Sequence, residues 1–196
     1  MMSMQASRGV PAYVTAIAAA WIVAAGVAWA AMTWKMEAPA SKLTFNAKQA
    51  GANFEGRFEK FAADIRFDPK DLAGSRFDVR IDLASVNSKD KDRDDTLRSA
   101  DFFDIKRWPQ ARYVAERFTA KGPGKYSAVG KLTLRDVTRE TPIEFSFEPD
   151  AANKGAWLKG TAQIKRLEFG VGQGEWKDVE WVADDVRIDF ALKLLQ

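Results

Sequence analysis

The dominant feature of this chain is a hydropathy period of two, which begins after Ser41 and continues almost to the C-terminus. Successive side chains of a β-strand point to opposite faces, so this alternation predicts strands with one buried and one solvated face. Residues 77–83 (FDVRIDL) show it most clearly, because every second residue is apolar. The pattern predicts strands at 42–48, 61–67, 77–83, 111–118, 132–134, 143–147, 158–164 and 186–194.

The alternation slips once, within 111–118. Tyr113 and Phe118 both have the character of core residues, yet they lie at positions of opposite parity. One extra residue in the strand reconciles them, so a β-bulge is predicted there.

One stretch of the domain is predicted to be helical, residues 91–99, because aspartates come early in it and Arg98 comes late, as the helix dipole favours. A short turn is expected at 53–58. Turn chemistry at 122–124, 150–155 and 170–174 predicts connections between strands.

About eight antiparallel strands joined mostly by short turns are compatible with a sandwich or with a closed up-and-down barrel. Closure removes exposed strand edges and therefore favours the barrel. The fold prediction is an all-β, eight-stranded antiparallel up-and-down barrel with one short helix at 91–99. A barrel of this size is either filled by its own side chains or holds one small ligand.

Composition excludes several kinds of site. Neither cysteine nor histidine occurs in the 196 residues, which removes thiolate nucleophiles, imidazole bases and the usual zinc and copper ligand sets. The 30 basic residues nearly balance the 27 acidic ones and are interleaved with them, so nucleic acid is not expected as a partner. The carboxylates of 90–95 do not fit the Ca²⁺-loop spacing and are interpreted as a solvated charge run. We expect no catalysis and no required cofactor or metal.

The N-terminal segment differs from the rest of the chain. Residues 1–33 contain a single charged side chain, Arg8, and an apolar run at 14–29 that ends in Ala28-Trp29-Ala30. Small residues in this pattern suit a signal peptidase, so residues 1–30 are interpreted as a signal peptide. A retained membrane anchor is the alternative, since 9–34 is long enough to span a bilayer. Either interpretation places a single domain, residues 34–196, in the periplasm or outside the cell.

Several short motifs, in this order and spacing, resemble the YceI-like family of small secreted bacterial proteins. They are Gly56 with Phe58 and Phe61, FDP at 67–69, IDLASV at 81–86, RD at 93–94, LRSADFFD at 97–104, GKLTLRDVTR at 130–139 and RLEFG at 166–170. The GQGEW at 172–176 resembles a branch found beside membrane b-type cytochromes.

The resemblance implies a lipocalin-like barrel that carries a long isoprenoid chain, such as a polyisoprenoid or the tail of an isoprenoid quinone. It also implies a membrane b-type cytochrome as a possible partner and a homodimer as a plausible assembly. One departure concerns histidines that many members carry just before the position of Ser41 and near that of Gln49. Their absence puts in doubt any head-group or metal contact by those histidines, but leaves the apolar lumen unaffected.

An isoprenoid chain has almost no hydrogen-bonding capacity, so its receptor needs a dry apolar channel. At about 0.8 kcal/mol per buried CH₂, ten carbons supply several kcal/mol toward binding. Nine apolar residues fall at inward positions and are candidate ligand contacts, although each of them also suits plain core packing: Phe45, Phe67, Phe77, Ile81, Leu132, Phe145, Ile164, Ile188 and Phe190. Small inward residues such as Gly130 and Gly160 suggest room beside the larger rings, or accommodation of barrel taper.

Three further aromatic residues are candidates at the ends of the barrel. Phe102 and Phe103 follow the charged helix and are expected to turn inward beneath it, as a stopper or as the first contact with a lipid tail. Trp176 lies after a glycine-rich loop and suits either a quinone head or a cover for the core.

Three functions remain open on these observations. The first is a noncatalytic carrier of an isoprenoid lipid or quinone. The second is an interaction module with a filled barrel that docks on a membrane redox protein. The third, an enzyme built on carboxylates such as Asp101 and Asp104, requires two acids that converge on a concave site.

Overall fold

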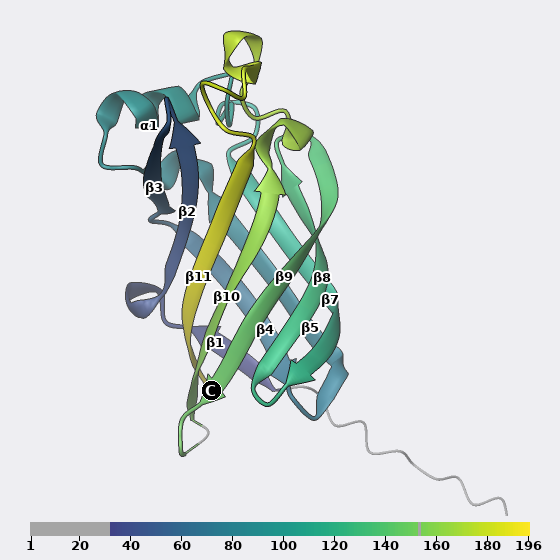
Figure 1. Ribbon diagram of the computed structural model, residues 1–196. Helices are drawn as coiled ribbons and strands as arrows, with labels where there is room; N and C mark the ends of the chain where they lie inside the picture. The colour runs from purple at the N-terminus through teal and green to yellow at the C-terminus, as the bar shows by residue number, and fades with distance from the viewer. Residues whose placement is uncertain (1–31, 153) are drawn as a thin grey trace, which may run out of the picture.

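A computed structural model describes residues 32–152 and 154–196. The predicted signal peptide, residues 1–30, lies outside the described residues. Eleven strands form one antiparallel sheet (Figure 1): β1 Thr33–Met36, β2 Lys42–Gln49, β3 Ala52–Phe58, β4 Phe61–Asp68, β5 Asp71–Asp82, β6 Val86–Asn87, β7 Gln110–Gly122, β8 Lys125–Leu134, β9 Val137–Pro149, β10 Gly155–Lys165 and β11 Asp185–Leu195. The helices are η1 Ala38–Ala40, η2 Leu83–Ser85, α1 Lys91–Arg98, η3 Arg166–Phe169 and η4 Gly174–Lys177.

Eight of these strands close into a barrel. Strand β1 pairs with β4 on one side and with β11 on the other, so the ring runs β1, β4, β5, β7, β8, β9, β10, β11 and back to β1. The predicted all-β, eight-stranded antiparallel barrel is therefore confirmed. Strands β2, β3 and β6 extend the sheet from β11 at the upper end in Figure 1, where α1 also lies.

Two local predictions are confirmed and one is wrong. The register shifts between Ala115 and Arg117 of β7, which is the bulge that the parity change predicts. Helix α1 spans Lys91–Arg98, and its N-cap Asp90 accepts a hydrogen bond from the Arg93 amide at 3.1 Å. A turn was expected at residues 53–58, but they belong to strand β3, which pairs with residues Thr44 to Gln49 of β2.

Gly56 explains why a turn was expected at 53–58 where the structure has a strand. This glycine lies directly opposite Phe45, and a Cβ placed on it would lie 2.2 Å from the Phe45 ring. The glycine in this strand therefore makes room for a ring from the neighbouring strand, although a glycine at this position in the sequence suggests a turn. Gly160 does the same for Phe190, with 2.5 Å between a placed Cβ and that ring. The space beside these inward glycines is filled by neighbouring rings.

The lower end of the barrel is filled by aromatic side chains. Phe67 is fully buried at the centre of this cluster, with ring centroids 5.0 Å from both Tyr126 and Phe147 and 5.4 Å from Phe145. The Trp34 indole of β1 donates a hydrogen bond to the Phe67 carbonyl at 2.9 Å and packs on Phe147. This cluster ties the closing strand to the core.

The outer face carries a compact ionic group at Asp78 of β5. Arg112 of β7 donates two hydrogen bonds to the Asp78 carboxylate, at 2.9 and 2.6 Å, and Arg76 lies 3.5 Å from it. Hydrogen bonding from Arg112 lowers the pKa of Asp78.

In residues 32–152 and 154–196, no helix has both the length and the apolar composition that a bilayer crossing requires.

We predict that Phe67→Ala destabilises the fold by about 3–5 kcal/mol, because the substitution removes a fully buried ring and leaves a cavity. Guanidinium chloride unfolding measures the change. Trp181→Ala is the matched control, since that ring is 52% exposed and its loss is expected to cost less than about 0.5 kcal/mol. Equal effects of the two substitutions would contradict a core role for Phe67.

We also predict that Asp78→Asn lowers stability at neutral pH, with a difference from the native chain that shrinks in acid. Because the folded-state pKa of Asp78 is lowered, its ionised form stabilises the fold above the unfolded-state pKa of about 3.9. That contribution disappears as the pH falls through the lower folded-state value. Thermal unfolding from pH 7 to pH 2 tests this, with the exposed Asp64→Asn as control. A pH-independent difference would refute the ionic explanation.

Candidate functional site

Two apolar cavities lie one above the other inside the barrel. The upper cavity has a volume of about 110 Å³ and the lower one about 80 Å³. All of the surface that faces them comes from apolar atoms. Four aliphatic side chains line both cavities and form the waist between them: Leu43, Ile81, Leu132 and Ile188.

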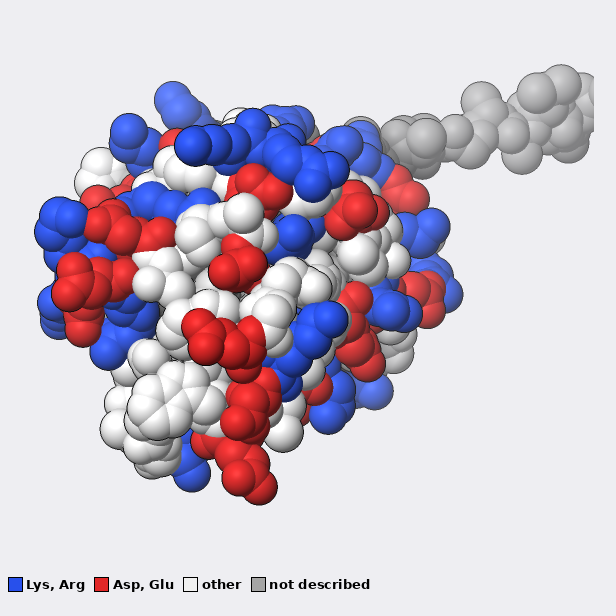
Figure 2. All heavy atoms as spheres, turned by 90° about the horizontal axis from the view of Figure 1, so that it is seen from above, with Lys and Arg blue, Asp and Glu red and all other residues white. Residues whose placement is uncertain are grey.

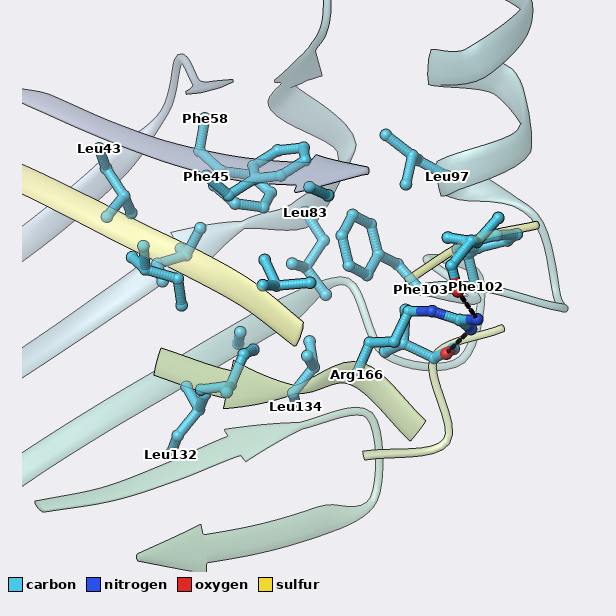
Figure 3. A pocket seen from close by; sticks show the side chains of 18 of the residues that line it. Leu43, Phe45, Phe58, Leu83, Leu97, Phe102, Phe103, Leu132, Leu134 and Arg166 are labelled. Carbon is cyan, nitrogen blue, oxygen red and sulfur yellow. Dashed lines mark hydrogen bonds between the residues drawn. The ribbon is translucent and has the colours of Figure 1, made fainter. Parts of the chain in front are cut away.

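Aromatic rings and the helix enclose the upper cavity (Figure 3). Phe58 of β3 packs between Phe45 and Phe103, with centroid distances of 5.6 and 5.9 Å. Leu97 of α1 also lines the cavity. Phe102 and Phe103, in the segment after α1, are both buried and both line it. The helix thus carries its charges outside, while the two phenylalanines that follow it face the lumen.

A buried arginine holds the upper end together. Arg166, at the start of η3, is only 4% exposed and donates hydrogen bonds to the carbonyls of Val171, Val182 and Ala183 at 2.9, 2.7 and 3.0 Å. Burial lowers its pKa from the ordinary value, but a guanidinium stays charged. In Figure 3 its nitrogens lie beside Phe102, away from Leu43 and Leu132 across the cavity, and dashed lines mark the hydrogen bonds to two of these carbonyls. Arg166 therefore clamps both ends of the 171–183 segment.

That segment is also fastened to the one that follows α1. The amides of Gly172 and Gln173 both donate to the Asp101 carbonyl, at 2.7 and 2.8 Å. Trp176 packs on the outer side of Phe102 with a centroid distance of 5.4 Å. The top of the barrel is thus covered by two crossing segments that are bound to each other by backbone hydrogen bonds and one aromatic contact.

Most of the ligand contacts expected from the sequence lie at the two cavities. Seven line the upper one: Phe45, Ile81, Phe102, Phe103, Leu132, Ile164 and Ile188. Phe77 and Phe190 line the lower one, together with the waist residues. The structure places three others elsewhere. Phe67 and Phe145 lie in the aromatic cluster below the cavities, and Trp176 lies outside them, against Phe102.

Sequence reasoning missed several lining residues. Phe54 and Phe58 were hidden by the expected turn, although Phe54, Gly56 and Phe58 do alternate with polar residues. Leu97 lies in the helix predicted at 91–99, in which no ligand contact was predicted. Nothing in the hydropathy pattern distinguishes Arg166 from a solvated arginine, because its burial depends on a segment 5 to 17 residues further along the chain.

The polar side chains near the site are engaged with one another. The buried Asp94 accepts hydrogen bonds from the amide and hydroxyl of Ser88, both at 2.7 Å. At the positions where the family resemblance implies histidines nearby, Ser41 bridges the Glu37 carbonyl and the Lys193 amide, and Gln49 accepts from Arg93 at 3.2 Å. Within 32–152 and 154–196, no three acidic, cysteine or histidine side chains are grouped to hold a metal ion.

Comparisons with known proteins agree with this architecture. BcnA of Burkholderia cenocepacia is 35% identical, with a TM-score of 0.77 over 81% of this chain and 98% of its own. The UPF0312 protein of Vibrio parahaemolyticus is 30% identical over 156 residues, which is 75% of this chain and 82% of that protein. A polyisoprenoid binding domain from Saccharophagus degradans, implicated in plant cell wall breakdown, shares the fold at 15% identity, with a TM-score of 0.64 over 83% of this chain and 97% of its own.

The family models give the same assignment over a longer stretch. The model of the YceI-like domain matches residues 34–194, from the closing strand β1 to the last strand β11. This range includes the cavities, the aromatic cluster and the Arg166 clamp. The chain therefore belongs to the YceI-like family.

Proposed function

We propose that this chain is a noncatalytic carrier that holds the hydrocarbon tail of an isoprenoid lipid in its barrel. The observation that carries the proposal is the pair of stacked cavities with wholly apolar walls inside a closed barrel. Such walls offer dispersion contacts and the exclusion of water, and these are the interactions that a polyisoprenoid can make. The Saccharophagus degradans domain of the same fold is named for polyisoprenoid binding, which supports the ligand class.

The empty space has an energetic cost that a ligand offsets. At about 24 cal/mol per Å³, the upper cavity alone lowers stability by roughly 2–3 kcal/mol. The neighbouring aromatic cluster demonstrates that rings can fill this barrel. A tail that occupies the cavities restores the missing contacts and therefore stabilises the folded state.

A long tail must also rearrange the interior. An engineered apolar cavity of about 150 Å³ accepts a benzene molecule, so about 110 Å³ accommodates only a few carbons at a time. The waist residues are aliphatic and change rotamers without breaking hydrogen bonds. When they move aside, the two cavities join along the barrel axis and receive several isoprene carbons.

An isoprenoid quinone is the form of this lipid that best suits the remaining sequence features. The GQGEW segment resembles a branch found beside membrane b-type cytochromes, which exchange electrons with quinones. We place the carrier in the periplasm, as the composition of residues 1–30 favours, with no required cofactor. Direct pairing with such a cytochrome and homodimer formation belong to the same proposal.

The second candidate function is an interaction module that docks on a membrane redox protein. Two apolar side chains at the upper end favour it, since Val179 and Trp181 are 50% and 52% exposed. Exposed apolar side chains next to the cover of the barrel suit a protein contact. Double substitution of both by Ser tests whether these side chains form a docking surface: the variant is then expected to lose its partner in pull-down from detergent extracts, while lipid binding inside the barrel stays unchanged.

We predict that the purified protein contains an isoprenoid lipid that organic solvent extracts and mass spectrometry identifies. For protein stripped of lipid, an added isoprenoid quinone at about 100 times its dissociation constant is expected to stabilise the fold by about 2.7 kcal/mol. Thermal unfolding detects this as a raised Tm, and quenching of tryptophan fluorescence reports the same binding. Preparations without lipid that also show no response to added quinone would refute the carrier.

We also predict that Ala111→Leu weakens isoprenoid binding at least about tenfold while the fold stays as stable or becomes more so. Ala111 of β7 is 3% exposed and lines the upper cavity, so a larger side chain occupies the space of the ligand. Ala120→Leu is the matched control, because it makes the same change at an exposed position of the same strand. Titration calorimetry measures both variants. Unchanged affinity in Ala111→Leu would show that the tail lies elsewhere.

A further inference from the structure

A mixed polar and apolar groove lies on the upper end of the molecule, outside the barrel. Its volume is about 260 Å³, and we call it the vestibule. It opens between helix α1, the end of β2 and the segment that carries Trp176. The vestibule is lined by Gln49, Phe54, Asp90, Asp92, Arg93, Thr96, Leu97, Phe102, Trp176 and Val182.

The floor of the vestibule is the ceiling of the upper cavity. Phe54, Leu97, Phe102 and Val182 line both spaces. These four side chains form a partition one side chain thick, and they come from β3, from α1, from the segment after α1 and from the segment before β11. The rest of the upper cavity is lined by strands of the sheet and by Leu83, Phe103, Arg166 and Val171. The partition can therefore open by side-chain rotation, without loss of backbone hydrogen bonds.

At the opposite end of the barrel, the described residues are closely packed. There Phe67, Phe145 and Phe147 pack edge to face, with Phe67 0% exposed. A tail that enters the upper cavity from the vestibule leaves its head group in the vestibule. The ligand is thus divided between the dry cavities of about 110 and 80 Å³, which hold the tail, and an outer, polar space that holds the head.

The charges of the vestibule determine which head group fits. Arg93 is already engaged: it lies 3.4 Å from the Asp90 carboxylate, donates to Gln49 at 3.2 Å and stacks 4.3 Å above the Phe54 ring. Asp92 adds a second carboxylate, so the lining residues are net negative by one charge. Seen from above in Figure 2, acidic and basic side chains interleave over this end. No positive field favours a phosphate.

We propose that the vestibule binds the uncharged, hydrogen-bonding head of the lipid, such as a hydroxyl or a ring carbonyl, and that the tail passes through the four-residue partition. This inference rests on the proposed carrier function and adds to it the way in, the position of the head and the selection against anionic heads. The Gln49 side-chain NH₂ group and the Thr96 hydroxyl oxygen, whose own hydrogen goes to the Asp92 carbonyl, supply the hydrogen-bonding groups around the head.

The position of the passage is tested with a single introduced cysteine, since the chain has none of its own. In Thr96→Cys, a bulky maleimide attached to the new thiol occupies the vestibule. The matched control is Thr119→Cys, which carries the same label on the exposed outer face of β7. We expect the Thr96 label to slow uptake of geranylgeraniol at least about tenfold by stopped-flow fluorescence, and the Thr119 label to have no effect.

Head-group selection is tested with two lipids that share one tail, geranylgeraniol and geranylgeranyl phosphate. The native chain is expected to bind the alcohol about tenfold more tightly at low salt. Asp92→Lys is expected to reduce the ratio of the two affinities roughly fivefold. At high salt the reduction is expected to be smaller, because the charges are then screened. Asp64→Lys makes the same change at a side chain that is 73% exposed on the outer face of β4, and it is expected to leave the ratio of the two affinities unchanged.

The results of these experiments distinguish failure of the vestibule site from failure of the proposed carrier function. If the native protein binds neither lipid, the proposed carrier function itself fails. If it binds them but the labelled Thr96→Cys protein takes up geranylgeraniol normally, or the phosphate binds as tightly as the alcohol, the vestibule site is overturned while the carrier stands. Circular dichroism of each variant establishes that it is folded before binding is measured.

Discussion

Closure of the sheet by β1 is the constraint on which the rest of this structure depends. Four residues, Thr33–Met36, pair with β4 and with β11, and the indole of Trp34 fastens them to the Phe67 carbonyl at 2.9 Å. Without that strand, β4 and the C-terminal end of β11 would present open edges, and water would reach the interior. Closure makes the lumen dry, and dryness is what gives an apolar cavity its affinity for a hydrocarbon.

The interior of the barrel is closely packed at its lower end and contains cavities above. Below, the rings around Phe67 supply close packing. Above them the walls leave cavities of about 80 and 110 Å³, separated by a waist of aliphatic side chains. The top is held by the buried Arg166, which bonds to three carbonyls and so orders the covering segment without placing charge against the lumen. A carrier needs this combination, because the packed end maintains the fold while the other end exchanges ligand.

The acidic side chains of the upper end lie outside the two cavities. The carboxylates of the 90–104 stretch cap the helix, bind Ser88 or pair with arginines, as Asp90, Asp94 and Asp95 show. These roles stabilise a charged cover over an apolar chamber. The charged helix and the two rings that follow it in the sequence therefore form the cover of the barrel together. The helix faces water, and Phe102 and Phe103 face the lumen.

The sequence by itself determined eight of the eleven strands that the structure describes, the helix at Lys91–Arg98, the bulge in β7 and most of the inward positions, because alternation, helix caps and parity are local properties. Only the tertiary structure decided that β1 closes the ring, that 53–58 is a strand beside Phe45, and that Arg166 is buried. It also decided that Phe67 and Phe145 fill the lower end, whereas Phe45 and Phe103 border a cavity. The reason is physical: a period of two states which face a side chain takes, but its depth along the barrel, and whether a ring from another strand fills the space in front of it, depend on pairings between residues far apart in the chain.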